Sequence, residues 1–141
     1  MKKLLGFLQL KFLPASTDLG LLILRVWLGL TMAINHGWGK VTGFGTMSGQ
    51  FPNYLGLGST VNLVIAIVGE LICALLLVAG LGTRFAALVL GVVMSVAFFV
   101  AHGGQLSGPG SGEMAFLYLA GCVTLLVAGP GKFSVDGKSG A

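Results

Sequence analysis

Four apolar stretches dominate this chain of 141 residues and restrict it to one class of fold. They cover residues 19–34, 61–80, 85–101 and 113–128, and we expect each to cross a bilayer as a helix. Hydrophobic residues make up 55% of the chain and charged residues 9%, with a mean hydropathy of +0.98. A soluble domain carries about 25% charged residues. The sequence therefore predicts an all-α fold, an integral membrane four-helix bundle.

The segments outside these stretches divide the chain into three parts. We expect residues 1–18 to form an interfacial segment, 19–128 the transmembrane domain and 129–141 a cytoplasmic tail. Lys2 and Lys3 precede a short apolar run that Gln9 and Lys11 interrupt, which favours an amphipathic helix lying on the membrane surface. The glycine-rich segment 42–59 is too polar to span and is expected to cap the outer mouth of the bundle.

Basic residues predict the orientation in the membrane. Six of them fall in the two terminal segments and the second-to-third connection, which a four-span topology places on one side. They are Lys2, Lys3, Lys11, Arg84, Lys132 and Lys138, whereas the opposite side receives Lys40. By the positive-inside rule, both termini are predicted to be cytoplasmic.

Two opposite charges lie inside apolar stretches, Arg25 in the first and Glu70 in the second. If the first helix ends near His36 and the second begins near Thr60, both charges lie ~15 Å from the same face. Ionised side chains are costly in hydrocarbon and normally face a partner or a cavity. We therefore predict that Arg25 and Glu70 pair. The pair is either a buried structural salt bridge or the lining of a polar pocket in which Glu70 exchanges protons.

A second group of polar residues is predicted at the outer mouth. His36, Lys40, His102 and Glu113 flank the outer ends of the first, third and fourth stretches. Two histidines and a carboxylate are compatible with a metal site, a proton relay or a quinone-headgroup site. The alternative is four interfacial residues that are satisfied by water. Since none of these residues share a close ligand spacing, no metal or haem is predicted.

These features in their order resemble the DoxX-like membrane protein family. The resemblance rests on Arg25, the segments 36–40, 69–70 and 80–84, His102, Glu113 and the segment 129–136. It implies a small four-helix protein of the bacterial cytoplasmic (inner) membrane. Some relatives are subunits of a membrane thiosulfate:quinone oxidoreductase, and others are associated with redox defence.

Together, the residues and the resemblance favour a quinone-linked redox subunit as the function. Arg25 and Glu70 are the candidate catalytic residues. The candidate quinone-binding residues are Arg25, His36, Lys40, Glu70, His102 and Glu113. We expect the lipid bilayer and either protein partners in a membrane complex or further copies of the chain as partners, and no nucleic acid. The alternatives are a non-catalytic assembly subunit of a larger membrane complex and a small transporter.

Overall fold

The computed structural model describes residues 1–140, and within this range the chain folds into helices and connecting loops without strands. Three elements are π-helical and carry the label η. The elements in chain order are α1 (Lys2–Leu8), α2 (Thr17–Met32), η1 (Ala33–Gly37), α3 (Trp38–Thr42), α4 (Phe44–Met47), α5 (Ser59–Ile67), η2 (Val68–Cys73), α6 (Ala74–Ala79), α7 (Thr83–Ser95), η3 (Val96–Ala101), α8 (Glu113–Ala128) and α9 (Val135–Ser139).

Successive elements join into three helices that are long and apolar enough to cross a membrane, Thr17–Thr42, Ser59–Ala79 and Thr83–Ala101. α8 is a fourth, shorter apolar helix of 16 residues. At ~1.5 Å per residue it measures about 24 Å, somewhat less than a hydrocarbon core of about 30 Å. The predicted all-α class is confirmed, and the chain is an integral membrane protein. The first helix, however, continues about a turn and a half past the exit predicted near His36.

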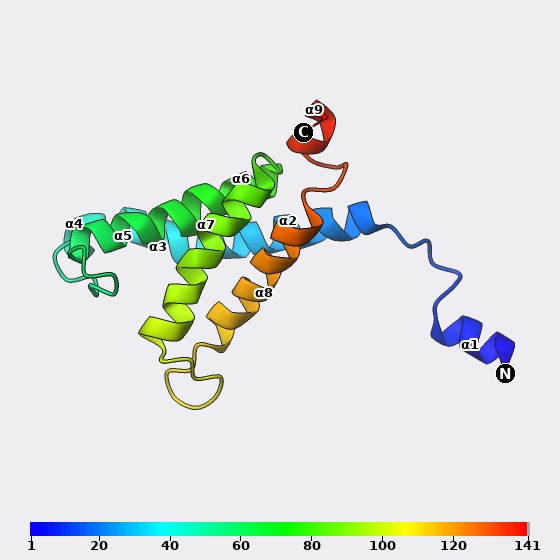
Figure 1. The fold of residues 1–141 in the computed structure, drawn as a ribbon, viewed down its shortest axis with the longest axis horizontal. Coiled ribbons are helices and arrows are strands. Elements are labelled where there is room, and N and C mark those ends of the chain that lie inside the picture. The colour runs from blue at the N-terminus through cyan, green and yellow to red at the C-terminus, as the bar shows by residue number, and fades with distance from the viewer. Residues whose placement is uncertain (141) are drawn as a thin grey trace.

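The helices form two pairs. α2 packs along α6, and α7 packs along α8 (Figure 1). Small residues permit the close approach within and between the pairs, as where Gly29 of α2 faces the backbone of Ala74 on α6. The pairs meet near the turn between α6 and α7 and diverge towards the connections 43–58 and 103–112 (Figure 1). The core between them is apolar and includes the fully buried Leu77, Leu90 and Leu125.

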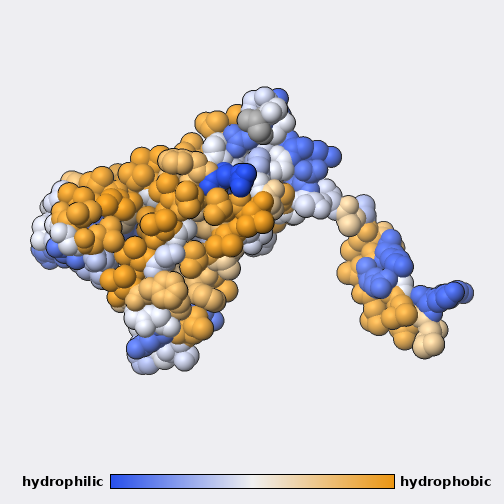
Figure 2. Space-filling view, viewed as in Figure 1, coloured by the Kyte–Doolittle hydropathy of each residue, from blue (hydrophilic) through white to orange (hydrophobic). Residues whose placement is uncertain are grey.

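Apolar side chains also cover the outside of both pairs (Figure 2). Trp27, on the outer face of α2, is 70% exposed, as is expected for a surface that faces lipid rather than water. The N-terminal α1 lies apart from the two pairs at the end of an extended connection (Figure 1). Its Leu4 and Phe7 are exposed, and its location on a membrane surface stays a prediction.

Residues 129–140 fold back onto the turn between α6 and α7. The Asp136 amide donates to the carbonyl of Gly80 at 2.9 Å, and the Asp136 carboxylate accepts from the amides of Gly82 and Thr83, both at 2.8 Å. Partial burial raises the pKa of Asp136, but these two amides and the charge of Arg25 lower it by more, so the pKa lies below its usual value. This C-terminal segment (residues 129–140) thus caps the start of α7.

Candidate functional site

Arg25 anchors the C-terminal segment and is not a partner of Glu70. The side chain is fully buried, and its Nη1 donates to the carbonyls of Leu77 at 2.9 Å and Val78 at 3.2 Å. Its Nη2 donates to the carbonyl of Phe133 at 2.7 Å. These carbonyls belong to the end of α6 and to the C-terminal segment. The predicted Arg25–Glu70 pair is therefore wrong.

The length of the first helix explains this error. The helix runs on through η1, and Gly37, not Arg25, lies level with Glu70. A Cβ atom added to Gly37 would come within 2.6 Å of the Glu70 carbonyl oxygen. Arg25 precedes Gly37 by twelve residues, or about 18 Å along a helix. The two charges thus lie at different depths.

The partner of Glu70 is Lys40. The Lys40 Nζ lies 2.5 Å from Glu70 Oε2, with 18% of the lysine side chain and 9% of the glutamate side chain exposed. The same Nζ also reaches the carbonyl of His36, one turn earlier, at 3.4 Å. Lys40 and Glu70 were predicted to belong to two separate groups, and the structure brings them together into one.

π-helical segments lie around this ion pair. Glu70 is part of η2, His36 is part of η1, and η1 packs against η2. The third such segment, η3, forms the last six residues of the third long helix. π-helical turns are rare and often mark functional sites, because they reorient side chains and free backbone carbonyls.

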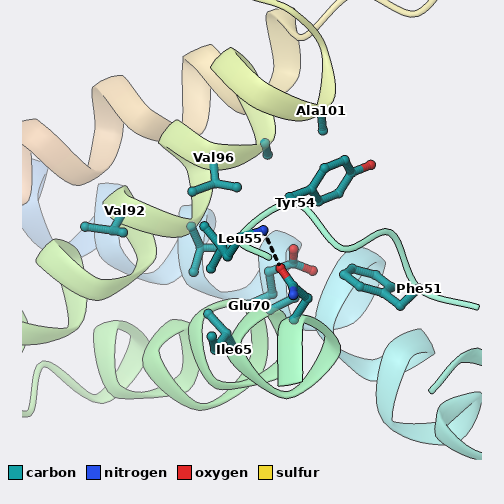
Figure 3. Close-up of a pocket in the computed structure, with 12 residues that line it drawn as sticks. Phe51, Tyr54, Leu55, Ile65, Glu70, Val92, Val96 and Ala101 are labelled. Carbon is teal, nitrogen blue, oxygen red and sulfur yellow. Dashed lines mark hydrogen bonds between the residues drawn. The ribbon is translucent and has the colours of Figure 1, made fainter. Parts of the chain in front are cut away.

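A cavity of about 120 Å³ lies beside Glu70, between α5–η2 and α7–η3 (Figure 3). Glu70 projects into it from η2, and the loop carrying Phe51, Tyr54 and Leu55 covers it from the other side (Figure 3). Most of its lining is aliphatic, and Val92, at its edge, is 55% exposed. The cavity therefore reaches the apolar outer surface of the helices beside Val92, and the exposed Tyr54 and Leu55 border it at the covering loop.

Asn62 fixes the loop over this cavity. Its Nδ2 donates to Asn53 Oδ1 and to the carbonyl of Gly58, both at 2.8 Å, and its Oδ1 accepts from the Leu55 amide at 3.0 Å. Figure 3 shows the last of these bonds crossing between the loop and α5. The Asn62 side chain is buried, and both its donor and its acceptor atoms are hydrogen-bonded. It therefore fastens the loop to α5, and we call this set of bonds the clasp. Sequence reasoning did not identify Asn62 as a site residue.

Comparison with known proteins places this geometry in a family. The family model for DoxX matches residues 20–103, which include the Lys40–Glu70 pair, all three π-helical segments and the cavity lining. The chain belongs to the DoxX family. An uncharacterized protein of Haemophilus influenzae is 30% identical over 126 residues, which cover 86% of this chain and 83% of the relative. No solved structure matches.

The remaining candidate residues of this DoxX-family protein lie outside the ion pair. The His36 ring packs edge-on against Tyr118 of α8, with ring centroids 5.8 Å apart. His102 and Glu113 are exposed at the connection between η3 and α8. Among residues 1–140, no hydrogen bond or ion pair joins either of them to Glu70, and no group of three or more potential ligands could hold a metal ion.

Proposed function

We propose that this DoxX-family protein is a quinone-linked redox subunit whose cavity beside Glu70 receives the ring of a quinone. One observation carries the proposal: a ring-sized apolar cavity, open towards the lipid-facing surface, has an ion-paired carboxylate in its wall. Membrane quinones are apolar rings with polar oxygens, and they enter their sites from the bilayer. Both requirements are met by the same cavity.

The size and chemistry of the cavity fit such a ring. An enclosed apolar cavity of about 150 Å³ binds benzene, and this one is smaller, about 120 Å³, but it is not enclosed, so a ring need not lie wholly within it. Ligand sites typically combine an apolar lining with a few polar groups that fix orientation. Here Glu70 is the acidic side chain of the lining, and Phe51 and Tyr54 supply aromatic surface.

Each residue around the cavity has a distinct task in this proposal. A bound quinone supplies two-electron, two-proton chemistry, and the electrons come from a partner protein. Glu70 accepts or gives up the accompanying proton at Oε1, and Lys40 stabilises its charge at Oε2. The clasp at Asn62 holds the covering loop in place and keeps water out. Arg25 takes no part, because its guanidinium is engaged with three carbonyls elsewhere.

We further propose that both termini face the cytoplasm across a bacterial inner membrane. Asp18 Oδ1 accepts from the Lys132 amide at 2.9 Å, so the start of α2 and the C-terminal segment share one end of the molecule with the α6–α7 turn. Most of the basic residues belong to that end, which supports a cytoplasmic location. Reporter domains fused to either terminus should be active only in their cytoplasmic form, and an active periplasmic reporter would contradict the orientation.

The test is to measure quinone that co-purifies with the protein in native-lipid discs, by solvent extraction and mass spectrometry. We expect about one ring per chain in the wild type, counting quinone and quinol together, and a marked loss of this total in a folded Glu70→Gln variant. Asp18→Asn, a matched carboxylate-to-amide change at the other end of the molecule, should retain it. Quinone no higher than in a control membrane protein would contradict the proposal and favour a non-catalytic assembly subunit.

A further inference from the structure

We infer that this cavity selects the hydroxyl-bearing, reduced form of the ring, a quinol or phenol, over the carbonyl-bearing quinone. The inference rests on the proposed function, since it concerns the same cavity, and it adds which chemical form binds there. It follows from the hydrogen-bond donors and acceptors that remain free around Glu70.

The free polar atom offered by Glu70 is an acceptor. Lys40 occupies Oε2, and none of the residues in the range 1–140 donates a hydrogen bond to Oε1. Glu70 lines the cavity, whereas Lys40 is absent from its lining. The ammonium group of Lys40 is instead directed at Glu70 Oε2 and the His36 carbonyl. A ligand in the cavity therefore meets a carboxylate oxygen before it meets any cation.

The other polar groups of the lining do not supply a donor beside Glu70. Both Nδ2 donors of Asn62 are used within the clasp, and the Leu55 amide already donates to Asn62 Oδ1. Tyr54 carries a hydroxyl, but in Figure 3 this group points away from Glu70, towards the end of η3. Glu70 Oε1 is thus a free hydrogen-bond acceptor, and the cavity lining places no free donor beside it.

This arrangement discriminates between the two forms of the ring. A hydroxyl group can donate to Oε1 and form a charge-assisted hydrogen bond, whereas a quinone carbonyl would place a second acceptor against a carboxylate. Hydrogen bonds to charged groups are strong enough that their loss lowers affinity on the order of 10- to 100-fold. We therefore expect at least a 10-fold preference for the hydroxyl form.

Calorimetric titration of the full-length protein in lipid discs tests this preference. The probes are hydroquinone against 1,4-benzoquinone, and the redox-inert pair 4-methylphenol against 4-fluorotoluene, at neutral pH without oxygen. The hydroxyl member of each pair should bind at least ~10-fold more tightly. The preference should fall below about threefold in the double variant Lys40→Gln/Glu70→Gln, which leaves no stranded charge, and should persist in Asp18→Asn.

The possible outcomes separate the two proposals. Equal affinities within each pair, or tighter binding of 1,4-benzoquinone, would overturn the selectivity and leave the quinone-linked function standing. A preference that persists in the double variant would also overturn it, because the acceptor would then lie elsewhere. Failure of all four probes to bind would overturn both the selectivity and the proposed function.

Discussion

Lys40 and Glu70 illustrate how a buried ion pair constrains a membrane protein at the scale of single residues. Each side chain is largely removed from solvent, and each is tolerated because the other neutralises it. Removing one member strands a charge, whereas removing both leaves neutral groups that need no partner. This asymmetry separates the pair's contribution to folding from its proposed contribution to binding.

We predict that Lys40→Met lowers the free energy of unfolding by about 3 kcal/mol, because it leaves the Glu70 carboxylate buried and unpaired. The double variant Lys40→Met/Glu70→Gln should recover most of this loss. Thermal unfolding in lipid discs measures both. Additive losses in the double variant would show that the two side chains do not interact.

Gly37 is the contact residue between η1 and η2. We predict that Gly37→Ala destabilises the protein by about 1–3 kcal/mol, since its Cβ atom would meet the Glu70 backbone, which cannot move aside cheaply. Gly39→Ala is the matched control, because nothing lies within 4 Å of the added atom. The control should be neutral or slightly stabilising in thermal unfolding, and equal destabilisation by both changes would contradict this account.

The residue-scale predictions from the sequence were correct in part. The sequence identified Glu70 as a buried charge that needs a partner, and Lys40 as a polar residue of the first helix's outer end. It paired Glu70 with Arg25 because both charges lie in apolar stretches and the predicted helix ends place them at the same depth. Lys40 could have been proposed instead by extending the first helix through the segment 35–37. The carbonyl partners of Arg25 could not be predicted, because every residue has a backbone carbonyl and the sequence does not distinguish those that accept a hydrogen bond.

At the scale of elements, the π-helical segments decide where the site lies. η1 carries the first helix through residues whose polarity and glycine content predict an exit from the membrane. The lengths of the apolar stretches located all four helices but did not reveal these turns, since a π-helical turn requires only one extra residue in a helix. The covering loop was foreseen as a cap, and its fastening by Asn62 was not.

The C-terminal segment depends on the forked guanidinium of Arg25. We predict that Arg25→Lys loosens this segment. A lysine ammonium lacks the planar fork that donates to the Leu77 carbonyl at the end of α6 and to the Phe133 carbonyl at the same time. Hydrogen exchange should rise by an order of magnitude or more at the amides of residues 132–137. Arg84→Lys, whose parent side chain makes one exposed bond to Leu126, is the control. Unchanged protection in Arg25→Lys would contradict the anchoring role.

Asp136 gives the C-terminal segment an acid-sensitive contact. Its pKa in the folded protein lies below the ordinary value of 3.8, so its stabilising effect is complete above that value and is lost as the pH falls through the lower, folded pKa. We predict that Asp136→Asn lowers the melting temperature at pH 7 and that the difference from wild type shrinks below about pH 4. A difference independent of pH between 7 and 3 would show that the charge of Asp136 is not involved.

At the scale of the whole molecule, two diverging helix pairs enclose the cavity near their open side (Figure 1). The composition predicted the membrane class and the all-α fold, because apolar length and low charge leave few alternatives. The divergence of the pairs could not be predicted, since the sequence determines the order in which helices follow one another and not the angle between them. Consequently, the sequence grouped His36 with His102 and Glu113 at one mouth, whereas the structure places His36 against Tyr118 and leaves the other two exposed.

Photolabelling most directly tests the central claim that the cavity beside Glu70 is the ring-binding site. We would irradiate the protein in lipid discs with 2-azido-1,4-benzoquinone, in its oxidised and its reduced form, and locate the label by mass spectrometry. We predict label within residues 51–55 and 92–101, displaced by excess hydroquinone. Label confined to the groove on the outer face of α2 around Trp27, or not displaced by hydroquinone, would contradict the assignment.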